Sequence, residues 1–408
     1  MSYTATVERK EKRGGIFGTT LMIAGASMGG GMLGIPILTG LGGFFPGILM
    51  TTVIWLCMLA TALLIVEITL ALPNGSNMAS LAEHFFGPIG KYFVGIPYLI
   101  FYFFIVFGYE SASGTLLVGF LKDWTGVALP AAVGHLIIVI LLFFPLYFGT
   151  LVADRINRIL MVGFFATFLF ILFRGAQQVQ AKNLMRFEWT FMFLSGPILF
   201  AAFSFHNLIP TLVTYLDRNV RALRTSIFLG MGLTYVCYIL WQIDALGAIS
   251  QGKFWEAYEK GGPVTESFRV MSATSWLGQV AFYFAFFATS TSLLGASLGM
   301  IDFIADGLKI DLFERYGRKR FVLCLILLVP SLILSSLFPR VFFKAIGYAG
   351  GFGIAILNAG VPVWMAWKSR YQFHSEVPKL VPGKRPLLLT LLVVTFYIIY
   401  LQGIMLLQ

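Results

Sequence analysis

Polar groups that could do chemistry interrupt the long apolar runs of this sequence at only a few places. They comprise two carboxyl groups, an imidazole beside an amide, and four consecutive hydroxyls: Glu67, Glu110, His206, Asn207, Thr289, Ser290, Thr291 and Ser292. Such groups are costly at lipid depth, so each is a candidate for binding a ligand or ion or for carrying a proton. Each also has an ordinary alternative, a hydrogen bond to its own or a neighbouring helix.

The two acids lie at different depths of their runs. Glu110 is the most central and could carry a proton if it faces a cavity. Glu67 lies near one end of its run, where it could act at a gate or at the membrane interface. His206 is a third candidate for the proton, and the hydroxyls of 289–292 could coordinate a cation.

One further pattern indicates a different chemistry. Gly25-Ala-Ser27-Met-Gly29 fits the G-x-S-x-G elbow of serine hydrolases, and Ser27 shares a predicted depth with His206. That elbow needs a strand before it and a helix after it, whereas here apolar helix is expected on both sides. An intramembrane serine hydrolase is therefore a weak alternative.

The composition identifies the solvent that these groups face. Of 408 residues, 58% are hydrophobic and only 12% are charged, against about 25% charged residues in soluble domains. Too little polar surface is available to cover a globule in water, so the chain is predicted to be an integral membrane protein. The three cysteines are odd in number and lie in apolar runs, which fits no metal site.

Apolar runs long enough to cross a bilayer occur eleven times. They lie near 16–38, 44–71, 93–120, 131–150, 156–174, 190–215, 225–250, 273–301, 321–338, 342–367 and 387–407. With the basic segment 1–15 in the cytoplasm, the loops on that side hold 20 of the 29 Lys and Arg residues. This asymmetry favours a cytoplasmic N-terminus, and an odd span count then places the C-terminus outside, in the periplasm or extracellular space.

Two spans contain residues that should interrupt a helix. The first carries five glycines and a proline in 25–36, and the sixth carries Ser195-Gly-Pro197 and the segment from Ser204 to Pro210. Matching interruptions five spans apart indicate an inverted-repeat transporter. The repeats would cover 16–175 and 190–368, with an added helix at 386–408. Close packing of small residues is the alternative for the first segment.

An interrupted helix exposes backbone groups that can bind a zwitterion. N–H groups at a half-helix start attract a carboxylate, and free carbonyls accept from an ammonium group. The phenylalanines beside the second break could pack on an aromatic substrate, while its histidine and asparagine could bond a hydroxyl or an indole N–H. The interrupted segments thus predict a binding site for an amino acid.

Four motifs resemble those of one transporter family. They are GASMGGGMLGIP at 25–36, FSFHNLIPTLVTYLD at 203–217, SLLGASLGMIDFIAD at 292–306 and FPRVFFKAIGYAGG at 338–351. With them the chain resembles, over nearly its whole length, the hydroxy/aromatic amino acid permease family within the amino acid–polyamine–organocation superfamily. Within that family it is similar to bacterial tyrosine- and tryptophan-specific permeases.

The resemblance implies an all-α inner-membrane protein of eleven helices with the leucine-transporter-type fold. It implies a substrate site at Ala24, Gly25, Ala26, Ser27, Met28, Gly29, Gly30, Gly31, Phe203, Ser204, Phe205, His206 and Asn207. Thr289 to Ser292 would correspond to the cation site of sodium-coupled relatives. Several proton-coupled relatives carry a lysine in the fifth helix, whereas 156–174 offers only Arg158 and Arg174 near its ends. Glu110 is the candidate carrier in its place.

These observations combine into one hypothesis, a proton-coupled symporter that imports tyrosine, tryptophan or both by alternating access. Sodium-coupled symport is the alternative within the same fold, and a channel is disfavoured because no helix has a continuous polar stripe. The sequence contains no Walker A loop or haem motif, so no cofactor is expected, nor an enzyme activity. The expected partners are the substrate and the bilayer, without nucleic acid or an obligatory protein partner.

Overall fold

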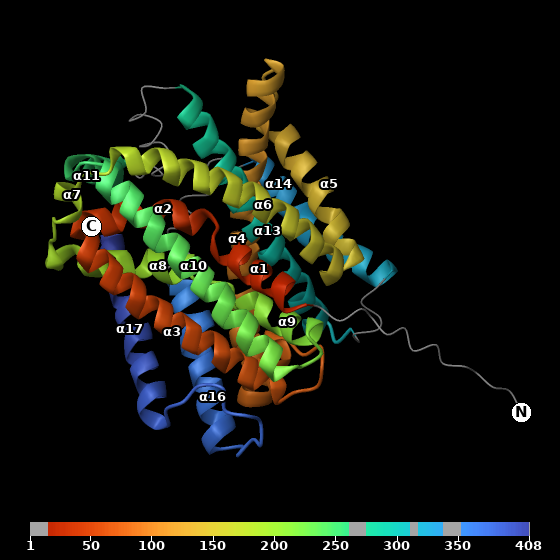
Figure 1. The fold of residues 1–408 in the computed structure, drawn as a ribbon. Coiled ribbons are helices and arrows are strands. Elements are labelled where there is room, and N and C mark those ends of the chain that lie inside the picture. Colours follow the sequence, from red (N-terminus) through yellow and green to blue (C-terminus); the bar gives the residue numbers. More distant parts are fainter. Residues whose placement is uncertain (1–14, 261–274, 311–316, 338–351, 408) are drawn as a thin grey trace, which may run out of the picture.

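The chain folds almost entirely into helices. The computed structural model describes residues 15–260, 275–310, 317–337 and 352–407. The first half contains α1 (Ile16–Ser27), α2 (Gly30–Gly42), α3 (Phe44–Leu70), α4 (Met78–Thr125), α5 (Ala131–Phe148), α6 (Thr150–Gly175), η1 (Ala176–Gln178) and α7 (Ala181–Leu184). The second contains η2 (Trp189–Ser195), α8 (Gly196–Ala202), η3 (His206–Leu208), α9 (Ile209–Tyr215), α10 (Val220–Ala248), α11 (Gln251–Lys260), α13 (Ser275–Gly307), α14 (Arg318–Leu337), η5 (Ala355–Gly360), α16 (Val361–Tyr371) and α17 (Arg385–Leu407). Figure 1 shows their arrangement.

Within the described ranges, nine helical segments are long and apolar enough to cross a bilayer. The bent pair α1 and α2 adds a tenth span if it is counted as one. The tenth expected span, near 342–367, and segment 1–15 lie partly outside the described residues, and the motif at 338–351 lies wholly outside them. The described part of that span forms η5 and α16. The protein is an all-helical membrane protein.

The third span differs from its expected extent of 93–120. α4 has 48 residues and begins at Met78, and Gly87 interrupts it with a positive φ of 79°. The stretch before Gly87 carries Glu83 and His84, which suit an interface better than lipid. Its polarity kept it out of the apolar count, although it continues the helix.

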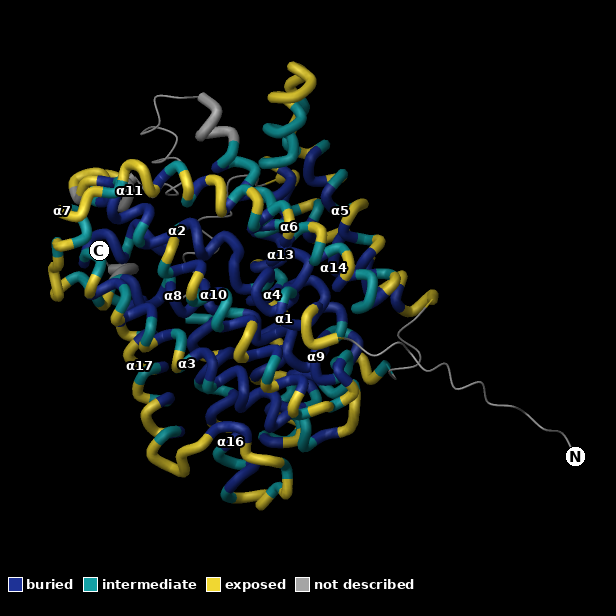
Figure 2. The backbone as a smooth tube through the Cα atoms, viewed as in Figure 1, coloured by how far each residue is buried: buried dark blue, intermediate teal, exposed yellow. Residues whose placement is uncertain are grey.

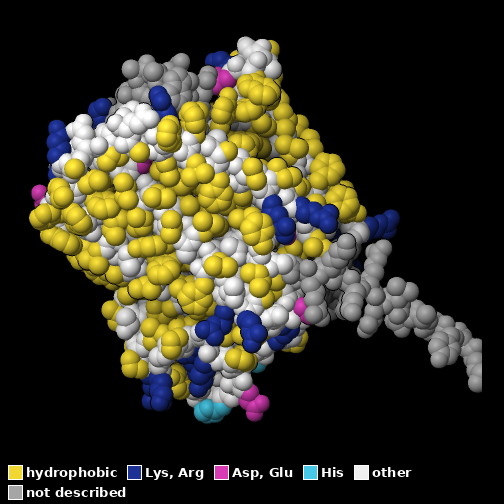
Figure 3. All heavy atoms as spheres, in the orientation of Figure 1, with side chains coloured by type: hydrophobic (Ala, Val, Ile, Leu, Met, Phe, Trp, Pro, Cys, Tyr) yellow, Lys and Arg dark blue, Asp and Glu magenta, His cyan; other side chains and the backbone are white. Residues whose placement is uncertain are grey.

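The surface and the interior divide as expected for a lipid-facing protein. Figure 3 shows hydrophobic side chains over most of one face, with Lys and Arg gathered mainly at its lower and right-hand parts. Figure 2 places the buried residues along the centre of the fold. α13 is 89% buried in its apolar window, whereas α6 is only 28% buried and exposes large apolar side chains such as Phe173. Apolar surface on this scale marks membrane contact.

The first span breaks inside its glycine-rich segment. α1 ends at Ser27, α2 begins at Gly30, and the two helices differ in direction by 54°. The Gly29 N–H donates to the carbonyl of Ser27 at 2.8 Å, so the regular ladder is lost there. A Cβ at Gly29 would collide with the hydroxyl of Ser292 and lie 3.1 Å from that of Tyr109. Glycine therefore allows two other helices to approach the break.

The sixth span breaks between α8 and α9. Residues 203–205 leave the helix and the short turn η3 follows before α9 begins. Pro197 and Pro210 lie in the first turns of α8 and α9, where a missing N–H removes no helical hydrogen bond. Proline thus restarts the helix on each side of the break.

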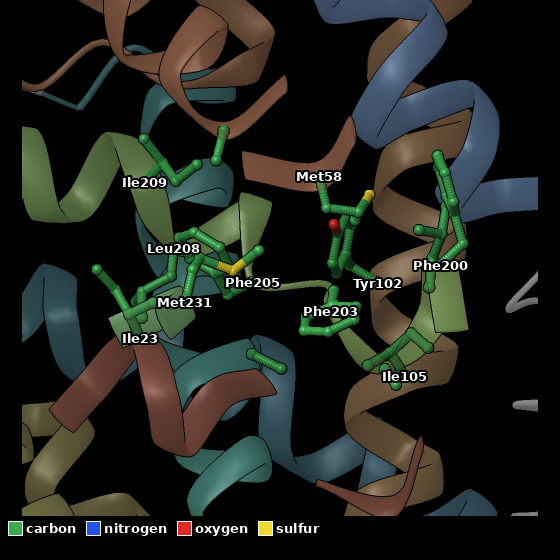
Figure 4. Packing of buried hydrophobic residues seen from close by; sticks show 14 of the residues in the cluster. Ile23, Met58, Tyr102, Ile105, Phe200, Phe203, Phe205, Leu208, Ile209 and Met231 are labelled. Carbon is green, nitrogen blue, oxygen red and sulfur yellow. The ribbon is translucent and has the colours of Figure 1, made fainter. Parts of the chain in front are cut away.

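The two breaks meet in one packed core. α10 packs along α1 and α3, and α13 packs against α4, α6 and α1. Figure 4 shows Ile23, Met231 and Leu208 gathered on one side of this core, with Phe203 and Tyr102 on the other. Segments from both halves of the chain therefore position the site.

Candidate functional site

Hydroxyl groups from two neighbouring helices meet the carbonyls that the first break releases. Ser292 Oγ on α13 lies within hydrogen-bond distance of the carbonyl oxygens of Gly25 and Ala26, at 3.0 and 2.8 Å. Tyr238 Oη on α10 lies 2.8 Å from the carbonyl oxygens of Ser27 and Ala202. Because one hydroxyl carries one proton, Tyr238 is shared between the two breaks and links them.

The second break has polar contacts of its own. Ser204 Oγ accepts from Asn358 Nδ2 at 2.6 Å, and Asn207 Nδ2 donates to the carbonyl of Ala296 at 3.1 Å. Phe203 and Phe205 are both buried, and the Phe203 ring packs on Tyr238 with centroids 4.8 Å apart. The two phenylalanines therefore contact protein here, although their positions flank the site.

A small cavity lies between the two breaks. Its volume is about 30 Å³, and it is lined by Ala26, Phe101, Tyr102, Ile105, Tyr109, Ala201, Ser204, Asn207, Ala296 and Ile354. Ligand pockets usually measure about 300–1,000 Å³. The lining is mainly apolar and aromatic, with some hydroxyl and amide groups. Such a lining suits a ligand that has an aromatic ring and a polar end. In this conformation the walls have closed on that space.

Three polar side chains at or beside this cavity, Tyr102, Tyr109 and Asn358, are absent from the sequence-based candidates. Tyr102 Oη donates to Asn358 Oδ1 at 2.6 Å, so Asn358 joins α4 to the second break. Tyr109 stands beside Gly29. Asn358 lies in η5, a π-helical segment, and such segments are frequent at functional sites. Asn358 could have been found from the sequence as an amide within an apolar run. Tyr102 and Tyr109 could not, because nothing distinguishes them from the other tyrosines among the 16 in the chain.

The remaining glycine-segment candidates pack tightly. A Cβ at Gly31 would lie 2.8 Å from Ala202 Cα, so α2 and α8 approach through their backbones. A Cβ at Gly25 would lie 2.8 Å from Asn157 Oδ1 on α6. Ala24, Met28 and Gly30 are buried. The segment thus provides both the cavity edge at Ala26 and close helix packing.

His206 is held by a neighbouring helix. Its Nε2 lies 2.9 Å from Thr61 Oγ1, and that hydroxyl donates to the Met58 carbonyl at 3.1 Å, so Nε2 acts as the donor to Thr61. Neither His206 Nδ1 nor Ser27 Oγ has a hydrogen-bond partner among the described residues. The nucleophile–base hydrogen bond of a hydrolase is therefore absent from this conformation.

Glu110 is buried against α14. Its carboxylate accepts from Ser335 Oγ at 2.7 Å and from Ser331 Oγ. It does not line the cavity between the breaks. These contacts match the structural alternative for this residue, and its role in carrying a proton stays a prediction.

Glu67 forms a buried ion pair with Arg370 on α16. Arg370 Nε and Nη2 donate to the two carboxylate oxygens at 2.6 and 2.7 Å, and the N–H of Leu380 adds a bond of 3.1 Å. Arg370 also reaches the carbonyl of Val381 at 3.3 Å. Glu67 thus joins α3 to α16 and to the segment that precedes α17.

The hydroxyl groups of residues 289–292 on α13 differ in their hydrogen-bond partners. Thr289 and Thr291 bond back to carbonyls of their own helix, while Ser292 reaches α1. Ser290 Oγ has no hydrogen-bond partner among the described residues. Over those same residues no cluster of three or more His, Cys, Asp or Glu side chains could hold a metal ion.

Two further features lie apart from the residues that line the cavity. Asp154 on α6 accepts from Arg158 Nη2 at 2.6 Å and from Tyr215 Oη at 3.0 Å, which ties α6 to the end of α9. A larger cleft of about 480 Å³ lies between the start of α4 and the end of α13, around Ser80 and Asp306. It is away from both breaks, so size alone does not identify the site.

Known proteins match nearly the whole length of this chain. The model of the tryptophan/tyrosine permease family matches residues 12–402. The tyrosine-specific transport system 1 of Haemophilus influenzae is 31% identical over 388 residues, covering 92% of this chain and 93% of that protein. The tryptophan-specific transport protein of the same species is 32% identical, covering 92% of each chain.

A more distant relative spans the chain equally well. The low affinity tryptophan permease of Escherichia coli is 27% identical over 382 residues, covering 91% of each chain. A permease carries its ligand across a membrane unchanged, so the protein is a transporter and not an enzyme. The chain belongs to the tryptophan/tyrosine permease family.

Proposed function

We propose that this protein imports tyrosine, tryptophan or both across the bacterial inner membrane as a proton-coupled symporter. The observation that carries the proposal is the pair of helix breaks facing one aromatic-lined cavity. The names of the relatives, which specify tyrosine and tryptophan transport, support the substrate class.

The substrate's polar end would bind the first break. The N–H groups of Gly30 and Gly31, at the start of α2, form a half-helix N-terminus that attracts a carboxylate. The ammonium group would take the carbonyls of Gly25 and Ala26 in exchange for Ser292. Both ends of the zwitterion would then be paired within the membrane.

The substrate's ring would enlarge the cavity between α4 and the second break. Phe101, Tyr102 and Ile105 supply its apolar wall, and Ser204 with Asn207 supplies hydrogen-bonding groups for a phenol or an indole. Packing against the ring accepts a phenol or an indole about equally, whereas a buried hydrogen bond to the substrate's hydroxyl discriminates strongly between substrates. The balance between tyrosine and tryptophan is therefore set at these polar groups.

Transport then requires alternating exposure of the cavity. We propose the leucine-transporter-type arrangement, with inverted repeats at 16–175 and 190–368, an added helix at 386–408, and a cytoplasmic N-terminus opposite the C-terminus. The corresponding breaks of α1–α2 and α8–α9 support this arrangement.

Sodium is the second candidate for the coupling ion. It is favoured by Ser292, whose hydroxyl already lies against the carbonyls of Gly25 and Ala26. Such oxygens could be sodium ligands. The proton remains the first choice because a buried carboxyl group, that of Glu110, is also present.

Uptake into liposomes tests the function. Purified protein should accumulate labelled tyrosine above equilibrium when an inward proton gradient is applied without sodium, and a protonophore should abolish the accumulation. Unlabelled tryptophan should compete if both are substrates. Accumulation that appears only after sodium is added would overturn proton coupling, and silence toward both amino acids under either gradient would overturn the substrate class.

A further inference from the structure

A buried carboxyl group near the end of α10 does not line the cavity between the breaks. Asp244, near the end of α10, is 2% exposed, and neither of its carboxylate oxygens has a hydrogen-bond partner among the described residues. Glu67, Glu110 and Asp154 are also buried, but each accepts hydrogen bonds. Asp244 is therefore a buried acid that no hydrogen bond from the described residues stabilises in its charged form.

The end of α6 closes over this carboxyl group. A Cβ at Gly175 would overlap the Asp244 carboxylate, so glycine is what permits the approach. One turn further along α10, the Gly247 carbonyl accepts from Gln180 N at 3.0 Å and from Asn183 Nδ2 at 2.8 Å. The segment that follows α6 is thus bonded to α10 directly beyond Asp244. Figure 1 shows the ends of α6 and α10 converging near α7.

Among the described residues, no charged group on the elements packed against α10 bonds to Asp244. α1, α2 and η1 contain no charged residue, and Glu67 on α3 lies toward the opposite end. The cations nearest in sequence on the covering elements are Arg174 on α6, Lys182 on α7, and Arg186. Arg186 donates to the carbonyls of Asn183 and Ile249. None of these groups hydrogen-bonds to Asp244.

α10 also connects Asp244 to the two helix breaks. Tyr238, Trp241 and Asp244 follow at intervals of three residues, so each side chain neighbours the next one along the helix. Tyr238 holds the carbonyls of both breaks, and Trp241 Nε1 donates to the carbonyl of Met32 on α2 at 3.1 Å. A displacement of α10 at Asp244 is therefore transmitted to the groups that shape the cavity.

We propose that Asp244 is a proton-binding site that couples protonation to closure of α6 against α10. A charged carboxylate cannot be buried there without a partner, so α6 closes only over the neutral acid. When α6 and its following segment separate from α10, water reaches the carboxylate and the proton exchanges with that side of the membrane. The inference rests on the proposed proton-coupled transport and assigns it a residue.

Asp244→Asn in proteoliposomes tests this assignment, because asparagine is uncharged at every pH. The variant should retain counterflow, the exchange of labelled for unlabelled tyrosine without any gradient, and should lose accumulation driven by a proton gradient. Asp123→Asn is the matched control, since it makes the same change at an exposed acid, and it should accumulate tyrosine as the unmodified protein does.

The outcomes separate the two proposals. If unmodified protein shows no proton-driven accumulation, the proposed coupling fails and this inference with it. If the unmodified protein and Asp244→Asn both accumulate tyrosine under the proton gradient, the inference alone is overturned.

A second measurement applies if Asp244→Asn fails to fold or to exchange. Infrared spectra of unmodified protein at neutral pH should show a carboxylic-acid band that shifts when aspartate is labelled with carbon-13. The isotope shift should disappear in Asp244→Glu, because the acid is then a glutamate. Absence of an isotope-sensitive acid band in the unmodified protein would overturn the proposal.

Discussion

At the scale of single residues, the site depends on polar side chains that hold one another across helices. Asn358 is the clearest case, because its amide joins Tyr102 on α4 to Ser204 at the second break. Both bonds are 2.6 Å long and the amide is fully buried. Any substrate hydroxyl that enters this region must exchange partners with this group.

Asn358→Ala should destabilise the protein by about 1–3 kcal/mol, because it leaves buried polar groups unsatisfied. It should also raise the KM for tyrosine. A double-mutant cycle with Tyr102→Phe should give a coupling energy of about 0.5–3 kcal/mol in thermal unfolding. Additive effects of the two substitutions would contradict the contact.

The sequence identified polar residues but not their partners. Glu67 was visible as an acid in an apolar run, yet its partner Arg370 is 303 positions away. Asp244 lies in the same kind of run. Its lack of hydrogen-bond partners among the described residues could not be predicted, because it depends on how the helices pack. Asn358 was missed for the same reason. Single-residue chemistry can be read from a sequence, whereas pairing requires the fold.

At the scale of helices, the ion pair between Glu67 and Arg370 fixes how α16 meets α3. Glu67→Ala should cost about 3–5 kcal/mol in the free energy of unfolding, because it strands a buried guanidinium. Replacing both residues by apolar ones of similar volume should recover much of the loss. Thermal unfolding in detergent measures both effects, and equal stability of Glu67→Ala and unmodified protein would contradict the pair's role.

The close approach of α2 and α8 supplies a second prediction for elements. Gly31→Ala places a methyl group 2.8 Å from Ala202 Cα and should reduce both stability and tyrosine affinity. Gly232→Ala on α10 is the control, since nothing lies within 4 Å of its Cβ position and alanine favours helix by about 1 kcal/mol. Binding titrations should separate the two variants, and indistinguishable affinities would count against backbone contact.

Helix breaks were the structural feature that the sequence predicted best. Glycine removes side-chain obstacles and proline removes an N–H, so Gly29, Pro197 and Pro210 locate the interruptions physically. Helix ends that lie outside the apolar runs were harder to predict from the sequence. The start of α4 at Met78 depends on a stretch whose polarity resembles a loop, although it folds as helix up to Gly87.

At the scale of the whole molecule, the distribution of Lys and Arg predicts the orientation in the membrane. Asp123→Cys and Gly75→Cys lie in consecutive connections on opposite sides of that scheme. In a background without Cys57, Cys237 and Cys324, an impermeant thiol reagent should label Asp123→Cys in intact cells. It should label Gly75→Cys only after permeabilisation, and the reverse pattern would invert the proposed topology.

The narrow cavity of about 30 Å³ between the breaks has a thermodynamic consequence. A conformer with walls this close excludes an aromatic amino acid. Substrate therefore binds only to open conformers and lowers the fraction of molecules in the closed one. The measured Kd then equals the intrinsic Kd divided by the fraction of molecules in open conformers. An antibody fragment that recognises only the closed form should weaken tyrosine affinity without touching the site, and tyrosine should weaken its binding by the same factor.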